Sequence, residues 1–467
     1  MSQPVIVWFR QDLRLNDNPA FAAAIQSNAP IIPVFVDDTA YGRAAGTTSL
    51  WWRNTSLRAL AGDLKTRGLT LIYRKGDGLA LMRALVEETN AATVFWNRQY
   101  EKDTIARDTQ LKSWLKENNR NGVGHVGNLF FDPWQIINKN SGSHYKVFSP
   151  FWKACLQAGL PCDLSVPPAQ LTAPEQWPES QPLPEASAAP ATGMDALWQP
   201  GERGALKMLD MFFENSFDGY ADNRDTPGGV TTSRLSPHLR WGEISPQRIY
   251  ASLGEERIDT NDGRKFLSEI GWREFSYYLL YHYPDMPERC LQQKFETFPW
   301  RDAPEDLEAW KQGRTGYPIV DAAMRELATT GFMHNRTRMI AASFLTKHLL
   351  IDWREGERWF WECLADADPA NNAAGWQWTA GCGADAAPYF RIFNPIIQGR
   401  KFDPDGTYTK TYAPELANLT GKVIFAPWEA SSDTLSDAGI SLDVDYPAPI
   451  VKHETARARA LDVFHAL

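Results

Sequence analysis

The sequence is poor in cysteine, and its cysteines are not spaced as metal ligands. Five occur among 467 residues, and no two of them form a CxxC pair. Scattered cysteines in odd number favour reduced thiols in a cytosol over a disulfide framework. They also argue against a zinc or iron-sulfur site, so we expect no metal. The five are Cys155, Cys162, Cys290, Cys363 and Cys382.

Long apolar runs and a secretory leader are also missing. No uninterrupted apolar stretch approaches the roughly 18 to 20 residues that a membrane span requires. The first residues, MSQPVIVWFRQDLRL, lack the basic segment, apolar core and cleavage site of a signal peptide. We therefore expect a cytoplasmic protein that has no membrane partner.

Positive charge is in deficit, because the formal net charge is -9 at pH 7. Affinity for nucleic acid comes mainly from Lys and Arg that neutralise phosphates, so this sum argues against such a partner. A sum conceals local patches, however, and a basic cluster occurs late in the chain. A solvated surface and a binding patch both explain it. The members are Arg336, Arg338, Lys347, Arg354, Arg391, Arg400, Lys401 and Lys410.

A glycine-rich dinucleotide fingerprint is absent from the N-terminal region. Apolar β-type runs alternate there with helical patterns, which predicts an α/β domain with a doubly wound, Rossmann-like parallel sheet over residues 1–132. The segment after the first run, RQDLRLNDNP, has no glycine, so this domain is not an ordinary NAD site. The runs are 4–9, 31–36, 69–74 and 92–97, and the clearest helical patterns are 18–26 and 78–88.

The rest of the chain divides into a linker and a helical region. Nine prolines and little apolar periodicity between Pro161 and Pro200 predict an extended linker, which we place at residues 133–200. From 201 to 467, apolar residues recur at spacings of three and four, so we expect an all-helical second domain. The clearest helical segments are 204–217, 316–332, 338–353 and 356–367.

Aromatic residues are abundant, with 19 Trp, 23 Phe and 15 Tyr. The stretch NNAAGWQWTAGC places Trp376 and Trp378 two positions apart among Ala and Gly, which allow close approach of another surface. Such rings either fill a core or line a site for a flat molecule. The residues themselves leave both interpretations open.

Three polar segments supply candidate site residues. In TTSRLSPHLRW, hydroxyls and an arginine precede a helical pattern, which fits a phosphate cradle or plain N-capping. Glu269, Trp272 and Arg273 share a helical face, where Glu269 either contacts a heteroaromatic ligand or pairs with Arg273. The third segment, MHNRTRM, adds polar side chains and a polarizable methionine after a turn.

Four long stretches carry a resemblance to a known family. They are VWFRQDLRLNDNPAF, TSRLSPHLRWGEIS, TGYPIVDAAMRELATTGFMHNRTRM and NNAAGWQWTAGCGADAAPYFRIFNPIIQGRKFDPDG. They resemble the photolyase/cryptochrome family, in particular its microbial cyclobutane pyrimidine dimer photolyases. The resemblance extends from Val5 to the final YPAPIVKHETARARAL. It implies an N-terminal antenna domain and a helical domain that binds FAD.

The resemblance also implies which residues hold FAD. Asn372 would face flavin N5, where an amide can act as donor or acceptor. The matching positions are Tyr220, Thr232, Ser233, Arg234, Leu235 and Ser236 for the pyrophosphate region, Arg338, Asp366 and Asp368 beside the flavin and ribose, and Phe266, Glu269, Arg273 and Asn335 elsewhere in the site.

The implied activity is light-driven repair of cyclobutane pyrimidine dimers in DNA by a monomeric carbon-carbon lyase. Excited reduced FAD would donate an electron to the flipped-out dimer, and Glu269 would hydrogen-bond that dimer. Trp376, Trp353 and Trp300 would relay electrons to the flavin. Residues implied to contact UV-damaged DNA, with little sequence preference, are Trp272, Asn335, Arg336, Met339, Trp378, Arg224 and Arg391.

The resemblance also bears on the branch of the family to which the chain belongs and on the identity of its antenna chromophore. Asn372 and MHNRTRM fit dimer repair, and the alternative is a cryptochrome-like blue-light receptor that signals through a protein partner. Folate-binding relatives show an Asn-Glu pair where QYEKDTIARD has Asp103 and Thr104. A second chromophore, either methenyltetrahydrofolate or a deazaflavin, and the absence of any antenna therefore stay open.

Overall fold

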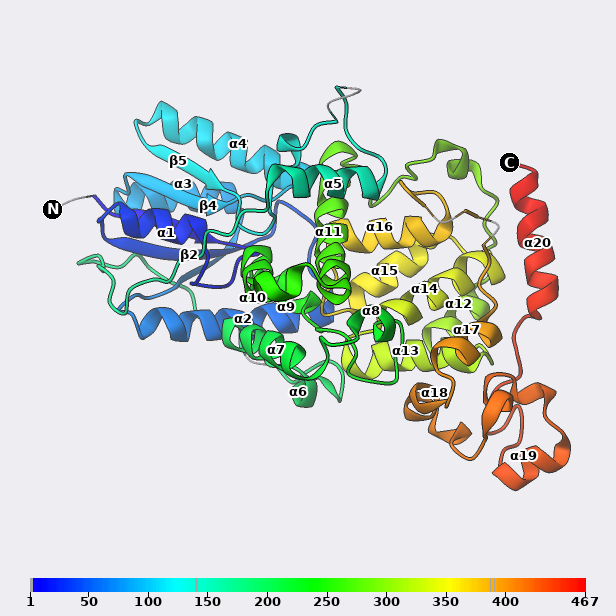
Figure 1. The fold of residues 1–467 in the computed structure, drawn as a ribbon. Coiled ribbons are helices and arrows are strands. Elements are labelled where there is room, and N and C mark those ends of the chain that lie inside the picture. Colours follow the sequence, from blue (N-terminus) through cyan, green and yellow to red (C-terminus); the bar gives the residue numbers. More distant parts are fainter. Residues whose placement is uncertain (1–2, 139–141, 186, 387, 390) are drawn as a thin grey trace.

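The N-terminal part of the protein is built on a five-stranded parallel sheet, shown at the left of Figure 1. A computed structural model describes residues 3–138, 142–185, 187–386, 388–389 and 391–467. The strand order is β3-β2-β1-β4-β5, which confirms the predicted doubly wound sheet. The strands are β1 (Val5–Phe9), β2 (Ile31–Asp38), β3 (Ile72–Gly76), β4 (Thr93–Asn97) and β5 (Asn121–His125).

Both faces of the sheet are covered by helices. Alternate residues of β1 enter two separate cores, one packed by α1 and α2 and the other by α3 and α4. Burial on both faces explains why the strands are continuous apolar runs. The covering helices are α1 (Pro19–Gln26), α2 (Thr47–Lys65), α3 (Gly78–Thr89) and α4 (Lys102–Glu117).

The edge strand β5 was not among the predicted strands, because its sequence NGVGH contains no apolar run. It is held by pairing with β4. A Cβ on Gly122 would lie 2.9 Å from both Leu115 Cδ1 and Trp96 Cη2, so glycine permits the close contact there. Pairing and packing, both non-local, created this strand.

The range predicted as an extended linker contains a regular helix, α5 (Phe148–Ala158). Its aromatic face, Phe148, Phe151 and Trp152, enters a core shared with α11 (Asn261–His282). From Gly159 the described backbone is extended and lies along the α/β part, where Thr172 O accepts from Ile31 N. Residues 139–141 and 186 lie outside the described part of this range.

The remainder of the described chain is helical, as predicted. All five cysteines of the protein are free thiols. Within the described residues, no helix combines the length and apolarity that crossing a membrane requires. The main helices besides α11 are α7 (Glu202–Asn215), α8 (Tyr220–Asn223), α9 (Ser236–Arg240), α10 (Pro246–Ile258), α12 (Pro304–Lys311), α13 (Pro318–Thr330), α14 (Asn335–Ser343), α15 (Trp353–Cys363), α16 (Pro369–Ala380), α17 (Pro395–Phe402), α18 (Thr407–Tyr412), α19 (Ser432–Ala438) and α20 (His453–His465).

The helical pattern predicted over 338–353 is interrupted in the structure. After α14 comes one π-helical turn, Phe344–His348, and the chain then reverses through Leu350 at φ 53°. Asp352 starts α15 by accepting a hydrogen bond from Arg354 N. The apolar spacing continues across the break because α14 and α15 each bury an apolar face in the same core.

Candidate functional site

A cavity of about 650 Å³ lies in the helical part, between α8, α9, α11, α14, α15 and α16. Its volume is within the range of small-molecule and cofactor sites. Of the residues predicted for the site, Trp353, Trp300 and Arg391 are absent from the lining, and the others all line it. Sequence segments more than 100 residues apart therefore converge on one hollow.

The predicted phosphate cradle forms one wall of this cavity. Arg234 adopts φ 51°, and α9 begins at Ser236 without any side-chain cap. Plain N-capping was the alternative for these hydroxyls, and the structure excludes it. Within the described residues no hydrogen bond occupies the Thr232 or Ser233 hydroxyl, so both are available to a ligand in the cavity.

Two aspartates at the start of α16 differ in what they can offer a ligand. Asp368 is committed to the protein, because one oxygen caps α16 and the other accepts from Tyr277 Oη at 2.5 Å. Asp366 pairs with Arg338 at 2.8 Å through Oδ2. Its Oδ1 is buried without a partner in the described structure, which leaves an acceptor for a ligand donor.

Asn372 is held in one orientation by a residue that the sequence did not single out. Its Nδ2 donates to Glu357 O at 3.0 Å and to Glu357 Oε1 at 2.8 Å. The same Oε1 accepts from Arg43 Nη1 at 2.6 Å. Arg43 comes from the loop after β2, so the α/β part contributes to this wall. Asn372 lines the cavity, and its side-chain oxygen has no hydrogen-bond partner in the described structure.

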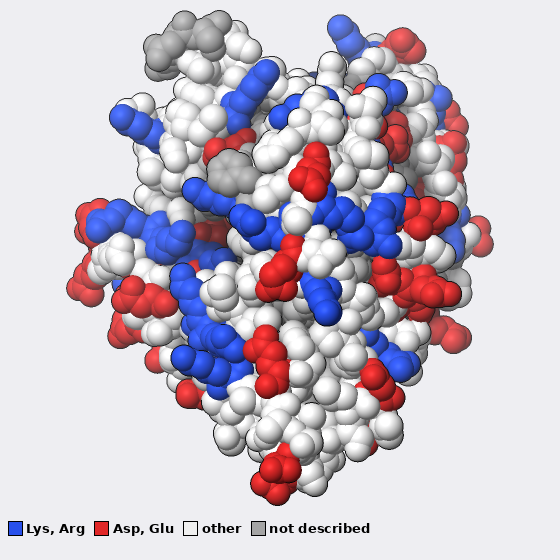
Figure 2. All heavy atoms as spheres, turned by 90° about the vertical axis from the view of Figure 1, so that its right-hand side faces the viewer, with Lys and Arg blue, Asp and Glu red and all other residues white. Residues whose placement is uncertain are grey.

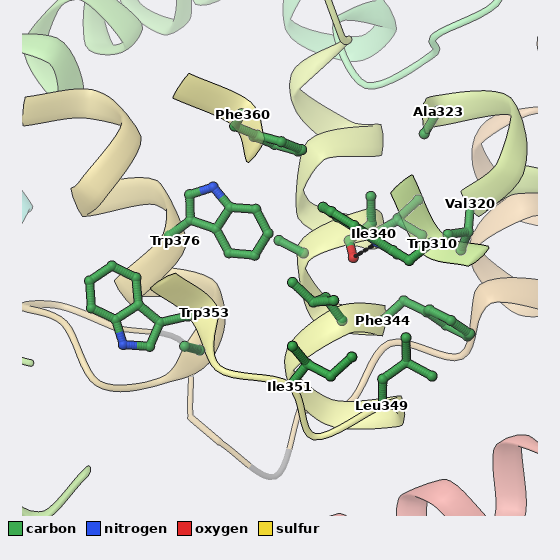
Figure 3. Packing of buried hydrophobic residues seen from close by; sticks show 14 of the residues in the cluster. Trp310, Val320, Ala323, Ile340, Phe344, Leu349, Ile351, Trp353, Phe360 and Trp376 are labelled. Carbon is green, nitrogen blue, oxygen red and sulfur yellow. Dashed lines mark hydrogen bonds between the residues drawn. The ribbon is translucent and has the colours of Figure 1, made fainter. Parts of the chain in front are cut away.

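The predicted tryptophan relay starts at the cavity wall and continues into one hydrophobic core. Trp376 lines the cavity and meets the ring of Phe360 edge-on at 4.9 Å (Figure 3). Trp353 is fully buried in the same cluster, and Trp300 is half-buried against it. All three indoles therefore belong to one hydrophobic cluster or pack against it, and this cluster reaches the cavity at Trp376.

Glu269 and the rings of Trp272 and Trp378 also line the cavity. The Trp272 ring lies on Phe148 of α5 with centroids 3.8 Å apart, and Trp378 is half-buried. Glu269 pairs with Arg224 and lies 3.4 Å from Lys265 Nζ. It does not pair with Arg273, the alternative that the spacing left open.

Arg273 is instead a buried structural donor. It donates to Asn128 O at 2.6 Å and to Leu239 O at 3.3 Å, which ties α11 to the α/β part and to α9. Because Arg273 donates to these carbonyl oxygens, the cations beside Glu269 are Arg224 and Lys265. Glu269 thus lies at the cavity wall with a side chain that is 27% exposed.

Comparisons with known proteins agree with this geometry. Residues 5–175 match the family model described as DNA photolyase, and residues 266–466 match the FAD binding domain of DNA photolyase. A deoxyribodipyrimidine photo-lyase of Agrobacterium fabrum is 47% identical, with 99% of this chain and 98% of that protein covered. The chain belongs to the photolyase/cryptochrome family.

Both branches of the photolyase/cryptochrome family are among its relatives. Cryptochrome-2 of Arabidopsis thaliana is 36% identical, with 98% of this chain and 78% of that protein covered. A bacterial class III photolyase from Agrobacterium tumefaciens superposes with a TM-score of 0.96 at 46% identity, covering 100% of this chain and 98% of the other.

The cavity fits the FAD that the family's second domain binds. It offers free hydroxyls and Arg234 on the cradle wall, an unpaired buried oxygen on Asp366, and aromatic and apolar walls. Such a site suits a ligand with a phosphate part, ribose donors and a flat ring. FAD is therefore the expected cofactor.

The predicted basic cluster is not one patch. Lys347 is buried, donates to Arg391 O at 3.1 Å, and has its pKa lowered to about 8 by burial. Arg338 and Arg354 are paired with acids. Arg391 is exposed, and Arg336 pairs with Asp225 at 2.6 Å. Figure 2 nevertheless shows a band of Lys and Arg across the face that is farthest from the sheet.

Arg43 and Glu357 were missed by the sequence interpretation. Glu357 lies in WREGERWFW, where charged residues alternate with aromatic ones as on a solvated helix, but its side chain is 4% exposed. Arg43 is 314 positions away in a short loop. No local pattern links the two, and only the packing of α2 against α15 brings them together.

Proposed function

We propose that this protein repairs cyclobutane pyrimidine dimers in DNA in a light-dependent reaction that uses reduced FAD. One observation carries the proposal. A single cavity has the cradle, Asp366, Asn372 and Trp376 on its FAD-suited walls, and the rings of Trp272 and Trp378 with Glu269 on the rest of its lining. When bound, reduced FAD supplies the electron that a photon mobilises for bond splitting.

The protein's own residues bind and orient the two partners. Asn372, which is fixed through Glu357, would face flavin N5 with its amide. Trp272 and Trp378 provide flat, half-buried faces on which a flipped-out dimer stacks. Glu269 accepts from ring N–H groups of the dimer, while Arg224 and Lys265 stabilise added negative charge nearby.

Trp376, Trp353 and Trp300 serve a separate task, the light-driven reduction of oxidised FAD. They pass electrons inward from the surface, so Trp300 is the outermost donor. We assign residues 1–132 to the antenna domain, 133–200 to the connection, and 201–467 to the catalytic domain, acting as a monomer. If the antenna domain holds a second chromophore, we propose that it is a folate or a deazaflavin.

Repair of a defined oligonucleotide tests the proposal. Reduced purified protein is illuminated with an oligonucleotide that carries one thymine dimer, beside a dark control and an oligonucleotide with a (6-4) lesion. Recovery of intact thymines from the illuminated dimer alone supports the proposal. Tight binding of FAD and DNA without repair overturns it, and favours a cryptochrome-like receptor.

A further inference from the structure

A cysteine sulfur contacts the middle member of the tryptophan relay. Trp353 Nε1–H donates to Cys290 Sγ at 3.3 Å. The other two indoles of the relay differ, because Trp376 Nε1 and Trp300 Nε1 are buried without a partner among the described residues. Of the three indole protons, that of Trp353 alone faces an acceptor in the described protein.

The surroundings of Cys290 favour its acting as an acceptor. Arg354 Nη2 lies 4.0 Å from the sulfur. Hydrogen bonding from the Cys382 thiol lowers the pKa of Cys290, against the opposing effect of burial, and burial raises the pKa of Cys382. Of the two thiols, Cys290 is therefore the one that ionises more readily.

Acidic groups nearby are already engaged. Glu296 binds Arg354 at 2.9 Å and also accepts from the Cys290 backbone N–H. Asp352 binds the same guanidinium at 3.1 Å. These contacts fix Arg354 beside the sulfur and leave neither carboxylate hydrogen-bonded to the Trp353 indole. Cys290 is thus the group positioned to receive its proton.

An indole that loses an electron becomes a strong N–H acid, so its proton moves to any base in hydrogen-bond contact. We propose that Cys290 is held as a thiolate beside Arg354, and that its Sγ accepts the Nε1 proton of Trp353 when Trp353 gives its electron to oxidised Trp376. The proposal rests on the electron relay of the proposed function. It assigns to Cys290 the role of proton acceptor, which the indole side chains of the relay cannot fill.

The step balances without an external reactant. Trp353 loses one electron to Trp376 and one proton to the Cys290 thiolate, which leaves a neutral indolyl radical beside a thiol. When Trp300 supplies the next electron, the proton returns from Cys290 to Nε1 and the thiolate is restored. Because return of the electron from Trp376 also requires return of the proton, the step slows wasteful charge recombination.

The test uses the FAD-loaded protein with Trp300→Phe, in which the relay ends at Trp353 and its radical persists. Light-minus-dark infrared spectra should gain an S–H stretching band, which shifts in deuterated buffer. The visible spectrum should be that of a neutral indolyl radical. Adding Cys290→Ala should abolish the band, give a radical-cation spectrum, and speed recombination several-fold.

Cys155→Ala in the same background is the matched control, because Cys155 is an equally buried thiol in a different core. It should leave the band and the radical spectrum unchanged. Retained FAD content verifies that each variant is folded. Cys382→Ala keeps the acceptor but removes the donor to it, and should weaken the band.

Several results overturn the inference. They are a radical-cation spectrum without an S–H gain in Trp300→Phe, the same radical with and without Cys290, or no tryptophan radical at all. Dimer repair by chemically reduced protein is measured on the same preparations, because repair does not require electron transfer through Trp353.

If the unsubstituted protein repairs no dimers, the proposed function is contradicted. If it repairs dimers but the tryptophan radical is the same with and without Cys290, only the role of Cys290 is contradicted.

Discussion

Two tryptophans that are neighbours in the sequence have different surroundings because they share a helix. Positions two apart on an α-helix point about 200° away from each other. Trp376 is accordingly buried in the hydrophobic cluster that also contains Trp353, and Trp378 is half-buried on the cavity wall. The core interpretation of the WQW stretch therefore holds for Trp376, and both rings line the cavity.

The position of Trp376 depends on a glycine of the adjacent helix. A Cβ on Gly356 would lie 2.0 Å from Trp376 Cη2, so the indole has to move in Gly356→Ala. We expect a loss of about 1 to 3 kcal/mol in unfolding free energy from overpacking, and slower light-driven reduction of FAD. Thermal unfolding and photoreduction rates measure the two effects.

The matched control is Gly62→Ala on α2, where a Cβ meets nothing within 4 Å. It should keep photoreduction and leave stability equal or up to about 1 kcal/mol higher, because alanine favours the helix. If Gly356→Ala reduces FAD in light at the normal rate, photoreduction does not depend on this position of the Trp376 indole.

The Glu269 side chain is predicted to act on the dimer as well as to line the FAD site. In Glu269→Ala we expect about tenfold weaker binding of dimer-containing DNA, because a charged hydrogen bond contributes about 1.5 kcal/mol, and a lower repair yield per absorbed photon. FAD content should be unchanged. Binding titrations and quantum-yield measurements check this.

Glu256→Ala serves as the control, because Glu256 is exposed on α10 with no ion pair in the described structure. It should match the unsubstituted protein in both measurements. An undiminished repair yield in Glu269→Ala would contradict the role assigned to this carboxylate.

At the scale of elements, the C-terminal helix α20 is attached through a pair of histidines. His348 Nε2 lies 2.9 Å from His453 Nδ1, and Arg459 Nη2 donates to His348 O at 2.6 Å. Burial lowers the pKa of His348 to about 3 and also lowers that of His453. The pair is therefore neutral in the folded state.

This attachment should weaken in acid. The folded pKa of His348 lies below the unfolded value of about 6.5, so the unfolded chain takes up the proton first, and stability is lost as pH falls below about 6.5 toward about 3. Between pH of about 6.5 and 5 the loss is about 2 kcal/mol. Hydrogen exchange of α20 amides, corrected for intrinsic rates, should show this.

His348→Gln should flatten that pH response, because the titrating group is removed. His465→Gln, at the exposed end of the same helix, should leave it intact. If the α20 amides of the unsubstituted protein are equally protected from hydrogen exchange at pH of about 6.5 and 5, the role of the histidine pair is contradicted.

The elements that were predicted correctly are those with strong local signals. The apolar runs of β1 to β4 and the periodicity of α13 and α15 are visible within single segments. The strand β5 and the break after His348 are not, because one depends on a neighbouring strand and the other on two helices packing in one core.

At the scale of the whole molecule, Lys and Arg form a band across one face although the formal net charge is -9 (Figure 2). Arg391 is an exposed member of the predicted phosphate contacts. In Arg391→Ala we expect weaker binding to damaged and undamaged DNA alike, and a slope of log K against log salt that is smaller by about 1. Binding titrations over a range of salt concentrations measure both.

Lys112→Ala on the exposed side of α4 is the comparison variant, because it removes equal charge from the α/β part. Its salt slope should equal that of the unsubstituted protein. Equal slopes for Arg391→Ala and the unsubstituted protein would exclude Arg391 as a phosphate contact.

The sequence by itself determined the parallel sheet, the helical second part and a set of site residues of which nearly all line the cavity, because periodicity and long motifs are local properties. Tertiary structure alone decided that Arg43 and Glu357 orient Asn372, that Glu269 pairs with Arg224 rather than Arg273, and that Cys290 meets Trp353. These partners lie between 15 and 314 positions apart. Such contacts depend on how helices pack, which no single segment encodes.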